Sequence, residues 1–300
     1  MKATRTILAI AAMAVAAGCA KQTESTDNGG VTALRVNSVT PRQTVSKAVI
    51  EGASFSSGDA IGIFLTDSDG GTVNYNFSNC KYTYDGSAWA AATDIMLSEA
   101  KGKLYACYPY DAAKTTLTAI PVESSLNGTD YMYAEPVDNV CKSDPAVNLT
   151  MHHALALISV KLVKDAAYTG STALTAVSLE GAGIAAGGNL NLTDGAISGA
   201  TAAVVSSGTI SGTITESGIT EKFLIVPAGV VTDAQDVNLK CTIDGRDYTA
   251  SFAASSGNGI VVRSNYHSTA TVTIKPGKLE VTSVSIVPWT TGSTAEVDLQ

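Results

Sequence analysis

The sequence predicts an all-β protein with two tandem antiparallel β-sandwich domains. Apolar and polar residues alternate with a period of two along most of the chain, for example at Ile61, Ile63 and Leu65. Four Asp-Gly dipeptides separate such segments, and Asp-Gly favours the type I′ turn of a β-hairpin. No segment repeats apolar residues at helical spacing over several turns, so helical crossovers between parallel strands are not expected.

The composition agrees with packed strands and argues against nucleic acid as a partner. Charged residues make up 15% of the 300 residues and hydrophobic residues 45%, with a formal net charge of −8. Strong helix formers such as Glu, Lys, Arg and Leu are scarce relative to Gly, Ser, Thr, Ala and Val. No basic cluster follows the N-terminal segment, whereas nucleic-acid binding requires a basic patch.

The N-terminal segment has the features of an export signal. Lys2 and Arg5 precede an uncharged apolar run over residues 7–17, which is shorter than the roughly 20 residues needed to span a bilayer. Residues 1–18 are therefore predicted to be a cleaved signal peptide. Small residues directly before Cys19 are the pattern of a bacterial lipoprotein signal, which predicts lipidation of Cys19. An ordinary secretory signal is the alternative.

The chain after the signal is predicted to divide at a loop-like segment that begins at Asp165. Residues 154–163 are typical of a central strand, and their alternation shifts at Leu157 and Ile158, which predicts a β-bulge. The predicted parts are a tether and propeptide, an N-terminal β-sandwich domain and a C-terminal β-sandwich domain, at residues 19–44, 45–164 and 165–300.

The C-terminal domain contains the clearest hairpin and ends in a separate strand. Residues 237–252 form two alternating arms around Asp244-Gly245. A second hairpin, in the N-terminal domain, is predicted around Asp85-Gly86. Residues 278–289 follow a Pro-Gly break, and their alternation shifts at Thr282-Ser283. A terminal strand of this kind can close its own sheet or pair with another molecule.

The sequence contains no convincing catalytic, metal or cofactor site. The four later cysteines form no C-x-x-C pair. A disulfide among Cys80, Cys107 and Cys141 is left open, and Cys241 lies at an apolar strand position. His152 and His153 are adjacent, so on a strand they point to opposite faces.

Two weaker motifs are also set aside. Residues 181–186 match G-x-G-x-x-A but lead into a hairpin rather than the helix that a dinucleotide site requires. Asp67 and Asp69 lack the Glu of a calcium loop, so an acidic turn is expected. Since there is no G-x-S-x-G motif either, we expect no enzyme, metal or cofactor.

Several segments together resemble the fimbrillin family, the lipoprotein pilins of type V pili. They include SKAVIEGASFSSGDAIGIF, YACYPYDA, TDYMYAEP, MHHALALISVKL, FLIVPAG and NYHSTATVTIKPGKLEVTSVSIVPW, at residues 46–64, 105–112, 129–136, 151–162, 223–229 and 265–289. The segments follow one another in the family's order and extend over nearly the whole chain after the signal.

The resemblance implies both a fold and a mechanism of assembly. It implies two transthyretin-like β-sandwich domains and a lipidated precursor that reaches the outer membrane and is exposed at the surface. A trypsin-like, usually Arg-specific protease then removes the propeptide with the first strand. A C-terminal strand of the next pilin subunit fills the groove that this opens, and the resulting fimbriae support adhesion to a host or bacterial surface receptor.

The resemblance transfers to particular residues only in part. Family members often have Arg where this chain has Lys47, and the nearest arginines are Arg42 and Arg35. The cleavage candidates are therefore Arg42 and Lys47, and a subunit that is not cut would serve as an anchor. The donor strand is expected within residues 278–300, with an ordinary core strand as the alternative. Its expected inserted side chains are Leu279, Val281, Val284, Ile286 and Trp289.

The sequence therefore favours a structural pilin or pilus-associated subunit, without distinguishing shaft, tip and anchor. The alternative function is a monomeric outer-membrane surface lipoprotein that binds glycans through exposed Trp and Tyr side chains. Only two tryptophans are available for such a surface, Trp89 in a hairpin arm and Trp289 in the terminal strand.

Overall fold

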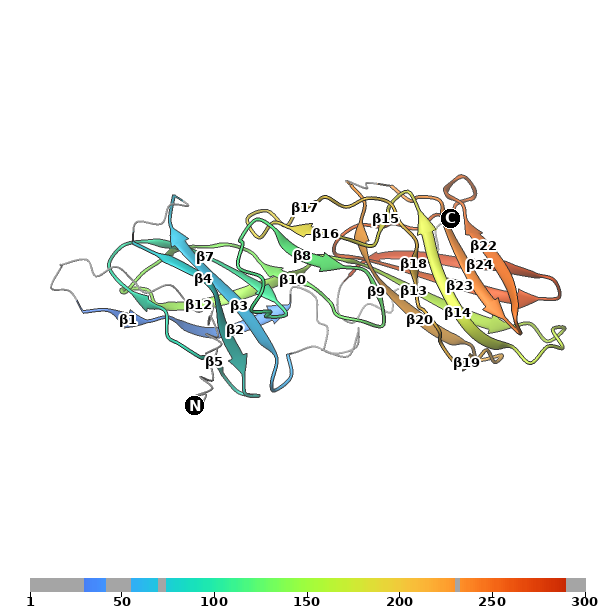
Figure 1. The fold of residues 1–300 in the computed structure, drawn as a ribbon, viewed down its shortest axis with the longest axis horizontal. Helices are drawn as coiled ribbons and strands as arrows, with labels where there is room; N and C mark the ends of the chain where they lie inside the picture. The colour runs from blue at the N-terminus through green and yellow to red at the C-terminus, as the bar shows by residue number, and fades with distance from the viewer. Residues whose placement is uncertain (1–29, 42–54, 70–73, 230–232, 290–300) are drawn as a thin grey trace, which may run out of the picture.

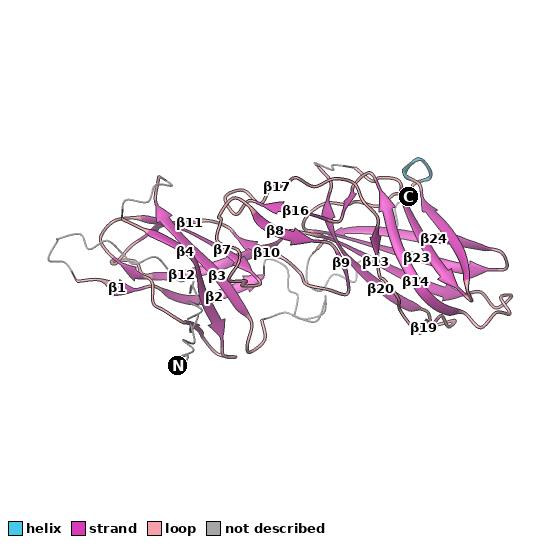
Figure 2. Cartoon of the chain, in the orientation of Figure 1, coloured by secondary structure: helices cyan, strands magenta, loops and turns pink. Residues whose placement is uncertain are grey.

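β-Strands account for almost all of the regular structure, as Figure 2 shows. The computed structural model describes residues 30–41, 55–69, 74–229 and 233–289. Within these ranges the helical structure consists of one short 3-10 helix, Ala254–Ser256. The all-β prediction is therefore confirmed. The signal peptide, Cys19, Arg42 and Lys47 lie outside the described residues.

The strands gather in two groups along the long axis of the molecule (Figure 1). The N-terminal group is an eight-stranded sheet with the order β2-β12-β10-β7-β3-β4-β5, in which β11 also pairs with β7. The bounds are β2 Arg35–Pro41, β3 Ala60–Asp67, β4 Asn76–Tyr84, β5 Trp89–Ala91, β7 Gly102–Tyr108, β10 Met132–Ala134, β11 Val137–Val140 and β12 Ala146–His153. A short pair, β1 Thr32–Ala33 with β6 Met96–Leu97, lies beside it.

The C-terminal group contains a six-stranded and a five-stranded sheet. The first has the order β15-β20-β13-β23-β24 with β9 on β20, and the second has the order β18-β14-β21-β22 with β19 on β14. The bounds of the first are β9 Ser125–Leu126, β13 Ala156–Lys164, β15 Ile184–Ala185, β20 Ile219–Pro227, β23 Tyr266–Lys275 and β24 Lys278–Pro288. Those of the second are β14 Ala173–Gly181, β18 Val205–Ser206, β19 Gly212–Thr213, β21 Val237–Ile243 and β22 Arg246–Phe252.

A small sheet connects the two groups. It consists of β8 Ile120–Glu123, β16 Gly187–Leu190 and β17 Ile197–Ser198 in the order β17-β16-β8. β8 comes from the first half of the chain and pairs with β16 from the second half, for example Ile120 with Leu190. In Figure 1 these strands lie between the two groups.

The predicted hairpin at Asp244-Gly245 is confirmed. Ile243 pairs with Arg246 across it, and Asp244 and Gly245 have φ values of 51° and 71°. A type I′ turn requires positive φ at both central residues, which these two residue types tolerate. Tyr84 pairs with Trp89 in the second predicted hairpin, so that turn is longer than two residues.

The predicted β-bulge at Leu157 and Ile158 is wrong. β13 pairs without a register shift with β20 on one side and β23 on the other. The alternation is lost because both faces of β13 are buried: Leu157 and Ile158 belong to different apolar clusters. Strands covered on both faces have continuous apolar runs.

Three apolar clusters form the interior. The N-terminal core includes Ile63, Leu65, Leu104 and Leu149, and the C-terminal core includes Ile158, Leu174, Leu239 and Val272. The third, which we name the junction core, includes Phe64 and Tyr105 from the N-terminal sheet, Leu157 and Leu224 from the six-stranded sheet, and Trp289, which follows β24. Since this cluster takes side chains from both groups, it joins them through apolar contact.

The division of the chain at Lys164 remains a proposal, and the strand pairing favours an earlier boundary. Both neighbours of β13 in its sheet, β20 and β23, lie after residue 218. We therefore propose that the C-terminal domain begins near Ala154, where β12 has ended. The segment predicted as tether and propeptide, residues 19–44, contains β1 and β2.

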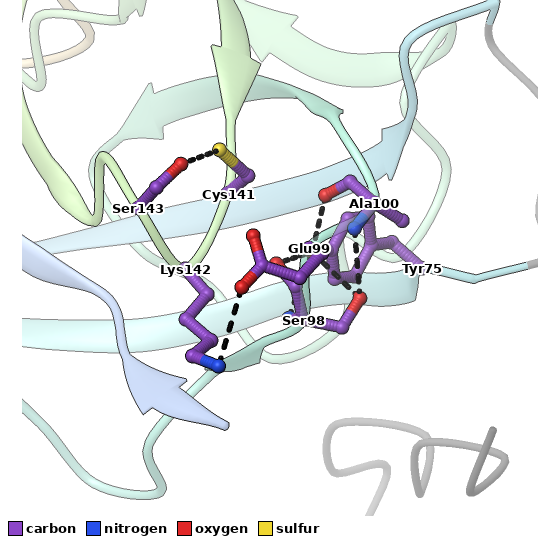
Figure 3. A network of polar contacts seen from close by, with 7 residues as sticks. All are labelled: Tyr75, Ser98, Glu99, Ala100, Cys141, Lys142 and Ser143. Atoms are coloured by element: carbon purple, nitrogen blue, oxygen red, sulfur yellow. Dashed lines mark hydrogen bonds and ion pairs between the residues drawn. The ribbon is translucent and has the colours of Figure 1, made fainter. Parts of the chain in front are cut away.

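A polar network holds the loop between β6 and β7 (Figure 3). The buried Tyr75 hydroxyl donates to the Ala100 carbonyl at 2.7 Å and accepts from the Ser98 N–H at 3.0 Å. The Lys142 ammonium lies 3.2 Å from a Glu99 carboxylate oxygen, and the Lys142 N–H donates to the Ser98 carbonyl at 2.7 Å. The network supports β6 and, through it, the N-terminal strand β1.

Candidate functional site

Strand β2 occupies one edge of the N-terminal sheet. It runs parallel to β12, from Arg35 opposite Ala146 to Pro41 opposite Met151. Leu34, Val36 and Val39 are buried, with exposed fractions of 4, 7 and 9%, and they pack in the N-terminal core. A strand that ends directly before Arg42 therefore fills part of the core.

The opposite face of β2 is exposed and polar. Arg35, Asn37 and Thr40 are exposed, and the Ser38 hydroxyl donates to Asn148 Oδ1 on β12 at 2.9 Å. A groove of about 450 Å³ lies between β2 and β5, the two edge strands of this sheet, and Arg35, Asn37, Trp89 and Asp94 are among its lining residues. Removal of β2 would join this groove to the uncovered edge of β12.

The C-terminal strand β24 occupies an edge of the six-stranded sheet. It pairs antiparallel with β23 along its whole length, from Lys278 opposite Lys275 to Pro288 opposite Tyr266. Within the described residues no strand pairs with its other side. Leu279 is buried, whereas Val281, Val284 and Ile286 are only partly buried. The structure thus places the expected donor side chains on the molecule's own sheet, and their transfer to another subunit remains a prediction.

Trp289 follows β24 and enters the junction core. Its indole stacks on the imidazole of His153, with ring centroids 3.7 Å apart and an interplanar angle of 8°. Trp289 is 4% exposed and His153 is fully buried. The backbone N–H of Trp289 donates to the Asn265 backbone carbonyl at 2.8 Å. The sequence patterns did not single out His153 for this role, because adjacent histidines indicate only opposite faces.

His153 is fixed by polar partners from two other segments. Its ring Nδ1 lies 2.7 Å from Asp130 Oδ2, and its backbone N–H donates to Asn265 Oδ1 at 2.9 Å. His152 points to the other face of β12, where its Nε2 lies 2.8 Å from Glu135 Oε1. The prediction that the two histidines face opposite sides is confirmed.

The free cysteines and the remaining histidine, His267, are packed within the fold. Cys107, Cys141 and Cys241 are buried free thiols, so no disulfide joins any two of Cys80, Cys107 and Cys141. Burial raises the pKa of Cys107 and of Cys241 to about 12, which keeps both thiols protonated at neutral pH. Burial, with a smaller effect of Lys222, lowers the pKa of His267 to about 4, and its Nε2 lies 2.8 Å from the Ser159 hydroxyl.

The acidic motif at Asp67 and the glycine motif at residues 181–186 both lie where a strand meets a turn. Asp67 is the last residue of β3 and is buried, and its carboxylate accepts the backbone N–H groups of Asn74 and Tyr75 at 3.1 Å. The expected turn follows it at Ser68 and Asp69. Gly181 ends β14 and Ile184 begins β15, so residues 181–186 form a strand end, a turn at Ala182-Gly183 and a short strand. In the part of the chain that the structure describes, no group of three or more metal-ligating side chains comes together.

The described residues do not offer an exposed tryptophan for sugar stacking. Trp89 is 9% exposed and packs against Phe55 and Tyr84, and Trp289 lies in the junction core. The described residues include no helix long and apolar enough to cross a membrane. The candidate functional features are two of the edge strands, β2 and β24.

Comparison with known proteins agrees with this fold. A candidate cell adhesion protein from Bacteroides uniformis has a TM-score of 0.62 and 22% identity, over 87% of this chain and 100% of that chain. One from Bacteroides ovatus has a TM-score of 0.61 and 20% identity, over 87% and 100%. The tip fimbrial protein Mfa3 from Porphyromonas gingivalis matches with a TM-score of 0.48 and 12% identity, over 78% and 95%.

Sequence comparison identifies a family directly. No curated protein matches the chain. The sequence profile described as Fimbrillin-like matches residues 46–289, which is most of the chain and includes the strands of both sheet groups except β1 and β2. The chain therefore belongs to the fimbrillin-like family.

Proposed function

We propose that this protein is a structural subunit of surface fimbriae that assembles with other subunits by protease-triggered donor-strand exchange. The observation that carries the proposal is the position of β2, an edge strand whose side chains fill the N-terminal core and which ends directly before a cleavage candidate, Arg42. Membership of the fimbrillin-like family supports the same function.

The energetics of β2 explain why cleavage would trigger assembly. Leu34, Val36 and Val39 are buried, and each such side chain contributes about 1.5–3 kcal/mol, or about 5–9 kcal/mol together. Loss of β2 would also leave the N–H and C=O groups of the β12 edge without partners, which favours pairing with a strand from another chain. Before cleavage β2 is part of the same chain and blocks the site.

A cut after Arg42 or Lys47 would also separate the subunit from Cys19. The proposed lipid on Cys19 and the strand β2 lie on the same side of both cleavage candidates. A cut subunit would therefore leave the outer membrane at the moment when its groove opens, whereas an uncut subunit would remain as an anchor. The proposal includes adhesion to a host or bacterial surface receptor as the role of the assembled fibre.

Limited trypsin digestion of the purified mature protein tests this proposal. We expect a new N-terminus at Gln43 or Ala48 and a high-mass ladder on SDS-PAGE without boiling. The double variant R42A/K47A should stay monomeric, and K21A, which removes an upstream trypsin site, should still form the ladder. A protein that is cut at the expected site yet stays monomeric would contradict donor-strand exchange. A monomer with an intact terminus would instead indicate an anchor subunit.

A further inference from the structure

The edge strands β2 and β24 have similar sequences. Leu34–Pro41 reads LRVNSVTP and Leu279–Ile286 reads LEVTSVSI. The identical residues are Leu, Val, Ser and Val, at positions 34 and 279, 36 and 281, 38 and 283, and 39 and 284. The differing residues at Arg35 and Glu280 lie on the more exposed faces of their strands.

The two strands also share an irregularity at the same place. On β2, Val36 pairs with Val147 and Ser38 with Asn148, so Asn37 is an extra residue without a partner. On β24, Val281 pairs with Val272 and Ser283 with Thr271, so Thr282 is the extra residue. Asn37 and Thr282 occupy the same position in the two eight-residue sequences. A β-bulge shifts the alternation of a strand by one residue, which turns Val39 and Val284 to the same side as Val36 and Val281.

The burial of the two strands differs in a way that favours transfer. Val36 and Val39 on β2 are buried in the N-terminal core. Their counterparts Val281 and Val284 are only partly buried where they pack on the C-terminal core. The same side chains would therefore bury more apolar surface in the β2 position than on their own sheet.

We propose that residues 279–286 of one copy take the place of residues 34–41 on β12 of a second copy, parallel to β12 and in the register of β2. Leu279 then occupies the site of Leu34, Thr282 forms the bulge at the position of Asn37, and Ser283 lies opposite Asn148. This inference rests on the proposed function and specifies the direction and register of the joint between subunits.

The apolar pattern alone fits either strand direction, so the position of the bulge is what distinguishes the two directions. Apolar positions 34, 36, 39 and 41 are symmetric, so an antiparallel strand would also bring four apolar side chains into the four sites. In that orientation Thr282 would replace Ser38 instead of Asn37. The bulge residue of β24 would then no longer coincide with the bulge position of β2. Register in a strand that is buried on one face is strongly specified, so the parallel orientation is preferred.

Disulfide mapping between two singly substituted proteins tests direction and register. The N148C protein is mixed with the S283C protein, and T150C with S285C, before cleavage and mild oxidation. The parallel register places each pair of cysteines on directly opposite residues, where a disulfide can form. A146C with S285C is the matched control, because only the antiparallel orientation places those residues opposite each other. Each variant alone gives the background from native cysteines.

The outcomes separate this inference from the proposed function. Disulfide-linked dimers of the first two mixtures, with none above background for A146C with S285C, would support the parallel register. A ladder in which A146C and S285C are linked, or in which no engineered pair is linked, would overturn this register while leaving donor-strand exchange intact. Absence of a ladder after complete cleavage of the wild-type protein would overturn the proposed function, and this inference with it.

Peptide competition gives a second measurement that needs no protein variant. A peptide of residues 278–289 and a peptide of residues 33–42 should both stop ladder growth, because each fits the β12 site. A 278–289 peptide that lacks Thr282 should lose this inhibition, since deletion of the bulge residue turns Val284 and Ile286 to the opposite face. Equal inhibition by the deleted peptide would overturn the role of the bulge.

Discussion

Replacement of Trp289 by alanine should destabilise the molecule and loosen its C-terminal strand. Trp289 is 4% exposed and its indole lies 3.7 Å from the His153 ring, centroid to centroid. Truncation of a buried aromatic side chain to alanine costs about 3–5 kcal/mol of unfolding free energy. A stacked aromatic pair accounts for about 0.5–1.5 kcal/mol of such a loss.

Urea unfolding followed by circular dichroism measures this effect without relying on tryptophan fluorescence. W289F retains a ring over His153 and is the matched control, so it should lose less than half as much stability as W289A. Because Trp289 fixes the end of β24, W289A should also form the ladder faster than the wild-type protein after cleavage. A loss of stability in W289A no larger than that in W289F would refute the assigned role of the indole.

The remaining predictions concern other contacts of the fold and the cleavage candidates. Y75F should lower the free energy of unfolding by about 1–3 kcal/mol, because the buried N–H of Ser98 loses its hydroxyl partner; an unchanged urea midpoint would contradict this. Hydrogen bonds led by that from Ser171 lower the pKa of Asp244 to about 2, so its contribution is present above pH 4 and lost as pH falls toward 2. The melting temperatures of D244N and wild type should therefore converge in acid, and a constant difference would exclude the linkage. If R42A alone keeps the N-terminus intact under an Arg-specific protease while K47A is cut normally, Arg42 is the cleavage site; cleavage of R42A would exclude it.

Local features of the fold could be predicted from the sequence, because their causes are local. The turn at Asp244-Gly245 depends on two residues that tolerate positive φ, and the alternation of β21 and β22 depends on one buried face. The all-β class follows from many such segments.

Features that depend on distant partners could not be predicted in the same way. The irregular alternation at Leu157 has two possible causes, a bulge or burial on both faces, and only the strands on either side of β13 decide between them. The stack of Trp289 on His153 joins residues far apart in the sequence. Likewise, the pairing of β2 with β12 shows that part of a segment predicted as tether contributes to the core.

The terminal strand of the candidate site could be predicted from the sequence, whereas its role as a donor strand remains a prediction. Residues 278–288 form the edge strand β24, and the shift at Thr282-Ser283 corresponds to an extra residue opposite β23. The buried position of β2 could not be predicted, because the polar residues before it indicated a tether rather than a strand. Its similarity to β24 becomes meaningful only when both are seen to be edge strands with a bulge at the same place.

The junction core has a consequence for the mechanics of a fibre. Apolar interfaces between sheet groups suppress the relative motion that is otherwise the default between domains. Phe64 and Tyr105 from one group and Leu157, Leu224 and Trp289 from the other share one cluster. Each subunit would therefore behave as a stiff rod, and bending of the fibre would be concentrated where one subunit meets the next. The spacing of those hinges would then be set by the length of a single subunit.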